Sequence, residues 1–141
     1  MSTQPQYWVV VAARDHALSG IAQGIVQANH GKAAPLRRMQ PGDRVVLYAP
    51  KLTYGRSEPC QLFVGLGTVA DEEVFQAHVA ADFQPFRRKV LYQAVQEAPI
   101  QPLLEDLSFI QNKTHWGYSF RVGCFGIPAN DFERIRQALL A

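Results

Sequence analysis

A chain of 141 residues has the size of one domain, and a composition of 48% hydrophobic and 18% charged residues excludes a disordered protein. The formal net charge of +2 at pH 7 excludes a strongly basic protein that coats a nucleic-acid backbone, so any such contact must come from a local patch. Cys60 and Cys124 stand in no metal-ligand spacing and are expected to be free thiols. We therefore expect a single domain over residues 1–141, without a metal or a cofactor.

We expect no targeting signal in the N-terminal residues. Residues 1–6 are polar and are expected to form a disordered tail. The apolar run Trp8 to Ala13 is too short for the hydrophobic part of a signal peptide or for a membrane span. We expect a cytoplasmic protein that makes no membrane contact, and a monomer.

The first predicted strand is Tyr7–Ala12, which is aromatic and β-branched. The polar run Arg14-Asp15-His16 follows, and a salt-bridged corner is the simplest interpretation of it. Apolar residues then recur three or four apart, the spacing of one helix face, at Leu18, Ile21, Ile25 and Ala28. Gly31 is suited to end this helix in a left-handed conformation. The unit places polar groups at both of its ends, which frames a pocket.

Three further strands are predicted in the middle of the chain, at Arg44–Ala49, Leu62–Val69 and Phe86–Val95. A strong turn signal, Pro41-Gly42-Asp43, precedes the first of them. Residues 50–61 form a loop that carries Lys51, Tyr54 and Arg56. Residues 70–84 fit neither period cleanly, and we favour an extended strand at 73–79 with a helix as the alternative.

The C-terminal part begins with Pro99 and Pro102, which permit at most a short helix over Leu103–Leu107. Residues 112–117 are predicted as a loop, 118–125 as a strand with two alternating faces, and 128–140 as a closing helix. Five or six strands with a leading and a terminal helix, without βαβ alternation, predict an α+β fold built as a small mixed barrel.

Five motifs occur in the order in which one known family has them: YWVVVAARDH, QANHGK-x-AP-L-x-RM-x-PGD, PFRRKV, W-G-x-SFR-x-G and I-P-x-x-DF-x-x-I. In these motifs the chain resembles the EVE domain family of the PUA-like superfamily, from Tyr7 to Leu140. The resemblance implies a PUA-like β-barrel flanked by helices. It also implies a partner, a nucleic acid (DNA or RNA) that carries a modified base, by similarity to the YTH domain, which holds an N6-methylated adenine of RNA in an aromatic cage.

The resemblance also suggests where a base would sit. Asn29 falls at the end of the first helix, and its amide offers donors and an acceptor to a base edge. Trp116, in a polar loop beside Gly117, is the expected stacking wall. YTH domains have a cage tryptophan near that helix end and this sequence has none there, so their cage is not transferred directly. The expected base contacts are Trp116, Asn29, His30, Trp8, Tyr48 and Phe86, and the expected phosphate contacts are Lys32, Arg87, Arg88 and Arg121.

Structural roles are the alternative for several of these residues: the core for Trp8, Tyr48 and Phe86, and the helix end for Asn29 and His30. For the whole protein we expect a non-catalytic reader of a modified base rather than an enzyme. No motif places His16, Asp15 or Cys60 in a catalytic arrangement. The alternatives are an ASCH-like amidohydrolase of modified nucleosides, which uses a lysine and a carboxylate, and an interaction module without a small ligand.

Overall fold

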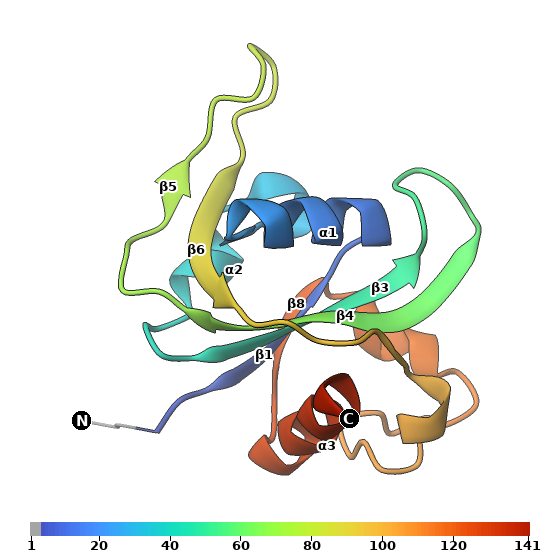
Figure 1. Ribbon diagram of the computed structural model, residues 1–141. Coiled ribbons are helices and arrows are strands. Elements are labelled where there is room, and N and C mark those ends of the chain that lie inside the picture. Colours follow the sequence, from blue (N-terminus) through green and yellow to red (C-terminus); the bar gives the residue numbers. More distant parts are fainter. Residues whose placement is uncertain (1–3) are drawn as a thin grey trace.

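The computed structural model describes residues 4–141 and shows one curled, mixed sheet with helices on both faces (Figure 1). The strands are β1 (Tyr7–Val11), β2 (Ile25–Val26), β3 (Arg44–Lys51), β4 (Pro59–Val69), β5 (Phe75–Gln76), β6 (Phe86–Tyr92), β7 (Ala98–Pro99) and β8 (Cys124–Ile127). The α-helices are α1 (Arg14–Gln23), α2 (Ala34–Arg37) and α3 (Ala129–Leu140). The 3₁₀ turns are η1 (Asn29–Gly31), η2 (Gln101–Leu103) and η3 (Trp116–Phe120).

The order of the main sheet is β2-β6-β4-β3-β1-β8, with β5 paired to β6 and β7 paired to β4. Strands β1 and β3 are parallel, with Tyr7 opposite Arg44 and Val11 opposite Tyr48, whereas the other pairs are antiparallel. A parallel pair needs a long crossover, and α1 lies in this one. The expected α+β mixed sheet with flanking helices is confirmed, as a half-barrel that contains one parallel crossover.

Alternation along the central strands supplies a separate core on each face of the sheet. In β1, Val9 belongs to the core beneath α3, together with Ile135, whereas Trp8 and Val10 belong to the core beneath α1. Figure 1 shows α1 and α2 on one face and α3 on the other. Because successive side chains of a strand point to opposite faces, a fully apolar strand such as β1 is buried on both.

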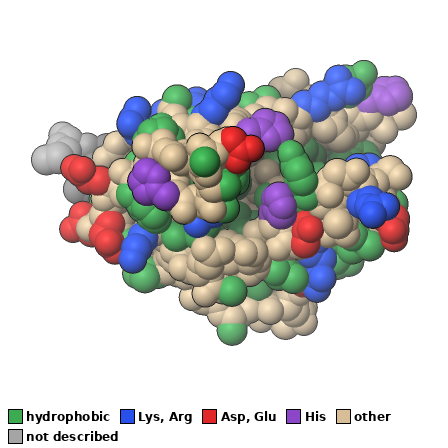
Figure 2. All heavy atoms as spheres, turned by 90° about the horizontal axis from the view of Figure 1, so that it is seen from above, with side chains coloured by type: hydrophobic (Ala, Val, Ile, Leu, Met, Phe, Trp, Pro, Cys, Tyr) green, Lys and Arg blue, Asp and Glu red, His purple; other side chains and the backbone are tan. Residues whose placement is uncertain are grey.

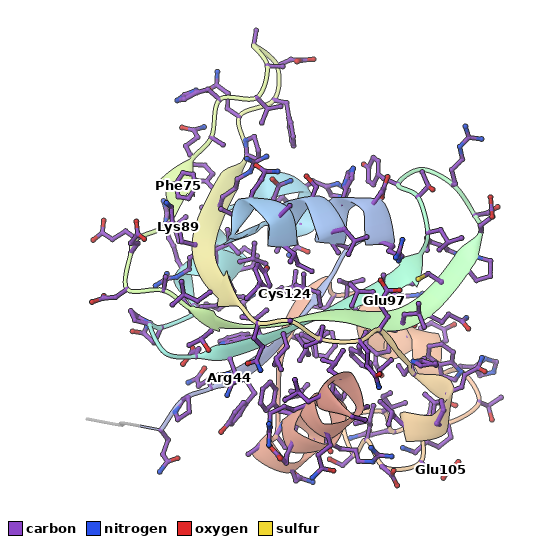
Figure 3. All side chains as sticks on the ribbon, viewed as in Figure 1. Arg44, Phe75, Lys89, Glu97, Glu105 and Cys124 are labelled. Carbon is purple, nitrogen blue, oxygen red and sulfur yellow. The ribbon has the colours of Figure 1, made fainter. Side chains whose placement is uncertain are left out.

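The start of α1 differs from the prediction. The polar run 14–16 forms the first turn of the helix rather than a corner before it. Arg14 forms an ion pair with Glu97 at 2.8 Å, and Glu97 lies beside this end of α1 (Figure 3). Asp15 forms no ion pair with another described residue; its carboxylate accepts the N–H of Tyr54 at 3.1 Å. The beginning of the helix is therefore tied to two later loops.

The end of α1 also differs, because the helix stops at Gly24 (φ 71°) and not at Gly31. Ile25, predicted as helical, pairs with Lys89 of β6 instead. This strand pairing outweighs the helical spacing of the apolar residues. Gly31 does adopt a left-handed conformation (φ 86°), but it closes the short turn η1.

In the second half of the chain, several predicted elements differ from the observed ones in type or in length. The predicted strand 118–125 is wrong: η3 covers its first part, and only β8 is extended. Phe120 is buried because its ring stacks on that of Tyr48 at 4.2 Å. Within 70–84 the favoured extended structure is confirmed, although β5 is only two residues long and is followed by a bridge between Ala80 and Phe83. Strand β6 ends at Tyr92, three residues before the predicted end. The region predicted to hold at most a short helix, 103–107, begins at the last residue of the 3₁₀ turn η2 and contains no α-helix.

The two ends of the described chain are also defined. Gln6, expected in a disordered tail, donates its N–H to the Asp43 carboxylate at 3.0 Å, and residues 1–3 of that tail lie outside the described residues. The closing helix is confirmed, with Pro128 immediately before it. None of the helices in residues 4–141 has the length and apolar character that crossing a membrane requires.

Candidate functional site

A cleft of about 810 Å³ opens on the α1 side of the sheet, where the parallel strands β1 and β3 end. Parallel strands end at the same edge, so the segments that follow them, around His16 and around Tyr54, meet in space. Part of α1, residues 27–30 and Phe83 of the β5–β6 hairpin complete the walls. The β3–β4 loop and the hairpin both rise on this side (Figure 1). A volume within roughly 300–1,000 Å³ is typical of ligand sites.

The floor of the cleft is apolar. It is formed by side chains of the core beneath α1 that are 1–3% exposed, among them Val10, Ala17, Val26 and Leu47. Tyr92 also lines it, and burial raises the pKa of its hydroxyl, which stays protonated and donates to the carbonyl of Ile25 at 2.9 Å. Such a floor favours a flat apolar ligand surface, at about 25 cal/mol per Å² buried.

The rim of the cleft is basic. We call Lys51, Arg56, Arg87 and Arg121 the rim cations; the described lining contains no Asp or Glu. None of the four forms an ion pair with a described residue. Seen from above, basic side chains lie mainly toward the edges of this face, and hydrophobic side chains, some of the histidines and some acidic side chains lie nearer its centre (Figure 2). Uncompensated positive charge around a cleft attracts anions.

The positive charge of Arg87 is not neutralised by its hydrogen-bond partners. Its Nε donates to Oε1 of Gln27 at 3.1 Å, and its terminal NH1 donates to Oε1 of Gln23 at 3.3 Å. Both acceptors are neutral amides, so the guanidinium is oriented but not neutralised. Arg87 is also one of the residues that line the cleft. It is therefore placed to bind an anion without first breaking an ion pair.

Asn29 and His30 form a corner of the cleft with an unusual backbone. Both are left-handed, with φ values of 49° and 60°, which few residues other than glycine adopt. Gly123, itself at φ 88°, lies against the Asn29 side chain so closely that a Cβ there would overlap the amide oxygen. Backbone strain of this kind persists where the surrounding structure holds it, and often at functional sites. The Asn29 amide is thus fixed at the edge of the cleft.

The described titratable groups form neither a metal site nor an activated cysteine. Within residues 4–141, no three His, Cys, Asp or Glu side chains are grouped so as to hold a metal ion. Both cysteines are free, as predicted. Burial raises the pKa of the Cys124 thiol to about 11, and burial also raises that of Cys60, so neither thiol is activated as a nucleophile.

Comparison with known proteins places this chain in a family. Residues 6–138 match the family model described as EVE domain. The chain belongs to the EVE domain family. It is 48% identical over 133 residues to a UPF0310 protein of Mycolicibacterium vanbaalenii, covering 94% of this chain and 92% of the relative. It is 46% identical over 132 residues to a UPF0310 protein of Mycobacterium avium, covering 94% and 96%.

Among solved structures, this EVE domain is similar to the YTH domain of the Zygosaccharomyces rouxii MRB1 protein in complex with N6-methyladenosine RNA. The TM-score is 0.67, the alignment covers 100% of this chain and 90% of that one, and the sequence identity is 13%. At this identity the likeness shows a shared fold. It agrees with the PUA-like relationship expected from the motifs.

The cleft brings together four of the ten side chains that the sequence singled out, namely Asn29, His30, Arg87 and Arg121. Trp116 lies elsewhere: it is half-buried, meets Phe120 edge-on at 6.4 Å and lines a separate recess of about 120 Å³. Lys51 and Phe120 border both hollows, so the indole lies beside the cleft and not at the Asn29 corner. The expected indole wall beside Asn29 is therefore corrected.

The other five predicted contacts also lie outside the cleft. Trp8 and Tyr48 are core residues, 7% and 1% exposed, which corrects their expected contact with a base. Arg88 is 6% exposed and donates to the carbonyl of Leu36 at 3.3 Å, so it too is a structural residue rather than a phosphate ligand. Phe86 packs on the core beneath α1, with a guanidinium over its ring, and Lys32 is exposed away from the lining.

Sequence reasoning missed three contributors to the cleft, Tyr54, Phe83 and His16. Tyr54 is 58% exposed and stacks on His16, with a ring-centroid distance of 4.6 Å and an interplanar angle of 16°. Phe83 is 41% exposed, at the tip of the β5–β6 hairpin. A usable signal was present for Tyr54, because an aromatic residue between two cations in a polar loop, Lys51 and Arg56, is a poor core candidate.

Proposed function

We propose that this EVE domain is a non-catalytic reader, which binds a modified base of a nucleic acid in the cleft. The observation that carries the proposal is an apolar floor surrounded by four uncompensated cations and, in the described lining, no carboxylate. A nucleotide has this distribution of properties, since its base is flat and its phosphates are anionic. The proposal is supported by the fold, which is shared with a YTH domain solved in complex with N6-methyladenosine RNA.

The corner at Asn29 supplies the polar contacts that a base edge requires. Its amide offers two donors and an acceptor, and Gln27, whose amide oxygen accepts from Arg87, lines the same cleft. An unpaired polar atom of a buried base costs about 1–3 kcal/mol, so these groups select which base is accepted. An added methyl group would rest on the apolar floor. A target inside a duplex must first be flipped out.

The amidohydrolase alternative has less support. Acid–base work by a lysine and a carboxylate requires the two to face one substrate. Lys51 lines the cleft, but its Nζ donates to the carbonyl of Ser57 at 3.3 Å, and no Asp or Glu of the described lining stands opposite it. The geometry therefore supports binding better than hydrolysis.

The test is a binding panel of single-stranded DNA and RNA oligonucleotides, each with one N6-methyladenine, 5-methylcytosine or 5-hydroxymethylcytosine, beside their unmodified counterparts. We expect at least tenfold tighter binding to one modified form, which is about 1.4 kcal/mol, and unchanged oligonucleotide masses. Equal affinity for modified and unmodified strands would refute the reader, and a changed mass would favour the hydrolase.

Two variants locate the site within that experiment. Asn29→Asp keeps the size and the tolerance for a left-handed backbone but removes the amide donors, so it should abolish the preference for the modified base. Trp116→Ala is the matched control: it lies outside the cleft and should leave the preference intact, although the melting temperature falls because the indole packs on Phe120. The reverse pattern would move the site to the small recess.

A further inference from the structure

We infer that Tyr54 is a second stacking site, which takes the base next to the one in the cleft, so that the partner is a single strand of at least two nucleotides. This inference rests on the proposed function and adds the length and strandedness of the ligand to it. It starts from an exposed aromatic ring at the edge of a basic cleft.

Among the described residues, the Tyr54 ring is stacked on a neighbouring ring on one side only. One of its faces lies against His16, at 4.6 Å between centroids and 16° between planes, yet the residue is 58% exposed. The exposed area must therefore come from the opposite face and the edge of the ring. An open aromatic face backed by a second ring is the form that base-stacking platforms take in single-strand binding proteins.

The loop that carries Tyr54 is held in place without a ligand. The Asp15 carboxylate accepts the N–H of Tyr54 at 3.1 Å, and the N–H of Asp15 donates to the carbonyl of Leu52 at 3.2 Å. A further turn bond joins the N–H of Arg56 to the carbonyl of Thr53 at 3.1 Å. Because these bonds order the ring before binding, less conformational entropy is lost when a base stacks on it.

The neighbours of Tyr54 indicate that the second ligand group is part of a nucleotide strand. Lys51, the last residue of β3, and Arg56, in the loop, flank Tyr54; both line the cleft, and neither is paired with a described carboxylate. A phosphate that links a base in the cleft to a base on Tyr54 would pass these two cations. In a duplex the adjacent base is already stacked and paired, so the open platform favours a single strand.

The experiment compares a mononucleotide with a trinucleotide on wild-type protein and Tyr54→Ala. The probes are N6-methyladenine and 5-methylcytosine, each as the nucleoside monophosphate and as the centre of a single-stranded trinucleotide, together with unmodified trithymidylate. Wild type should bind the trinucleotide more tightly than the monophosphate, and Tyr54→Ala should lose roughly 5- to 150-fold of trinucleotide affinity and a clearly smaller part of its monophosphate affinity.

Two further variants control for loss of structure. Tyr54→Phe keeps the ring and should retain the trinucleotide gain. Phe75→Ala removes an exposed aromatic residue on β5, away from the β3–β4 loop (Figure 3), and should change nothing. Melting curves of all variants should coincide with that of the wild type, since Tyr54 belongs to neither buried core.

The outcomes separate this inference from the proposed function. A trinucleotide gain that persists in Tyr54→Ala, an equal loss for both ligand lengths, or no gain in wild type overturns the stacking site. If no modified monophosphate is preferred but trithymidylate binding still depends on Tyr54, the reader proposal fails and the stacking site stands.

Discussion

Arg87 offers the sharpest test of the basic rim, because its charge is oriented by two glutamines and neutralised by no described carboxylate. We predict that Arg87→Gln weakens binding of a short single-stranded oligonucleotide and makes the binding less sensitive to salt. Each phosphate neutralised on a single strand contributes about 0.7 to the slope of log affinity against log salt. Four rim cations would therefore give a slope near −2.8, and the variant a slope shallower by about 0.7.

The loss of affinity follows from the same geometry. A hydrogen bond to a charged partner is worth about 1.5–3 kcal/mol, so affinity at low salt should fall roughly 10- to 150-fold. The fold should lose no more than about 1 kcal/mol, since the two bonds to neutral amides are replaced in part by bonds to water.

The assay is fluorescence anisotropy of a labelled oligonucleotide between about 50 and 200 mM salt. Arg134→Gln is the matched control, because Arg134 is paired with Asp106 at 2.9 Å and lies on α3, across the sheet from the cleft. Its slope should equal that of wild type. A slope in Arg87→Gln that matches wild type, or an equal change in Arg134→Gln, would refute the assignment of phosphate binding to this rim.

Three other predictions concern the framework around the cleft. Gly123→Ala should weaken binding and cost about 1–3 kcal/mol of stability, because φ is 88° and a Cβ would displace the Asn29 amide; unchanged affinity in calorimetric titration would argue against the corner. Asp43→Ala should cost about 3 kcal/mol or more in urea unfolding, since its buried carboxylate accepts three N–H groups, from Gln6, Trp8 and Gln40, and a loss below about 1 kcal/mol would contradict this. For Cys124, burial raises the folded pKa to about 11, so its contribution to stability is complete below about pH 8.5 and is lost as the pH rises toward 11. Urea unfolding at about pH 8 and 10 should show a larger decrease for wild type than for Cys124→Ala, and equal decreases would show that the thiol is not the cause.

The parts of the fold that were predictable are those in which local pattern and tertiary packing agree. Strand β1 is apolar throughout because it is buried on both faces, and α3 shows one apolar face because only one side meets the sheet. The Pro41-Gly42-Asp43 turn was recognisable because Gly42 needs a positive φ, which is 89°. Each of these signals has a single structural explanation.

The errors arose where two explanations fit the same residues. Ile25 continues the helical spacing of α1, but its backbone is needed to pair with β6, and Gly24 was as good a helix end as Gly31. Phe120 alternates as strand residues do, yet it sits in a 3₁₀ turn that brings its ring onto Tyr48. The spacing of residues within a segment carries no information about a pairing or stacking partner far away in the chain.

The cleft was only partly predictable for the same reason. Asn29 and Arg87 were singled out by their position in motifs, whereas Tyr54 acquires its place through the Asp15 carboxylate, 39 residues earlier. Trp116 was selected because an indole in a polar loop is rare in a core, but its edge packs against Phe120. Because Trp116 lines a recess and also contacts the buried Phe120, it fits the description of a binding residue and that of a packing residue.

The position of α3 has a practical consequence for handling the molecule. The C-terminus ends this helix on the side of the sheet opposite α1 (Figure 1). A protein immobilised on a sensor chip or fused to a fluorescent reporter through that end would turn its open side outward. Such a tether would leave the cleft open to the oligonucleotides used in the proposed binding tests.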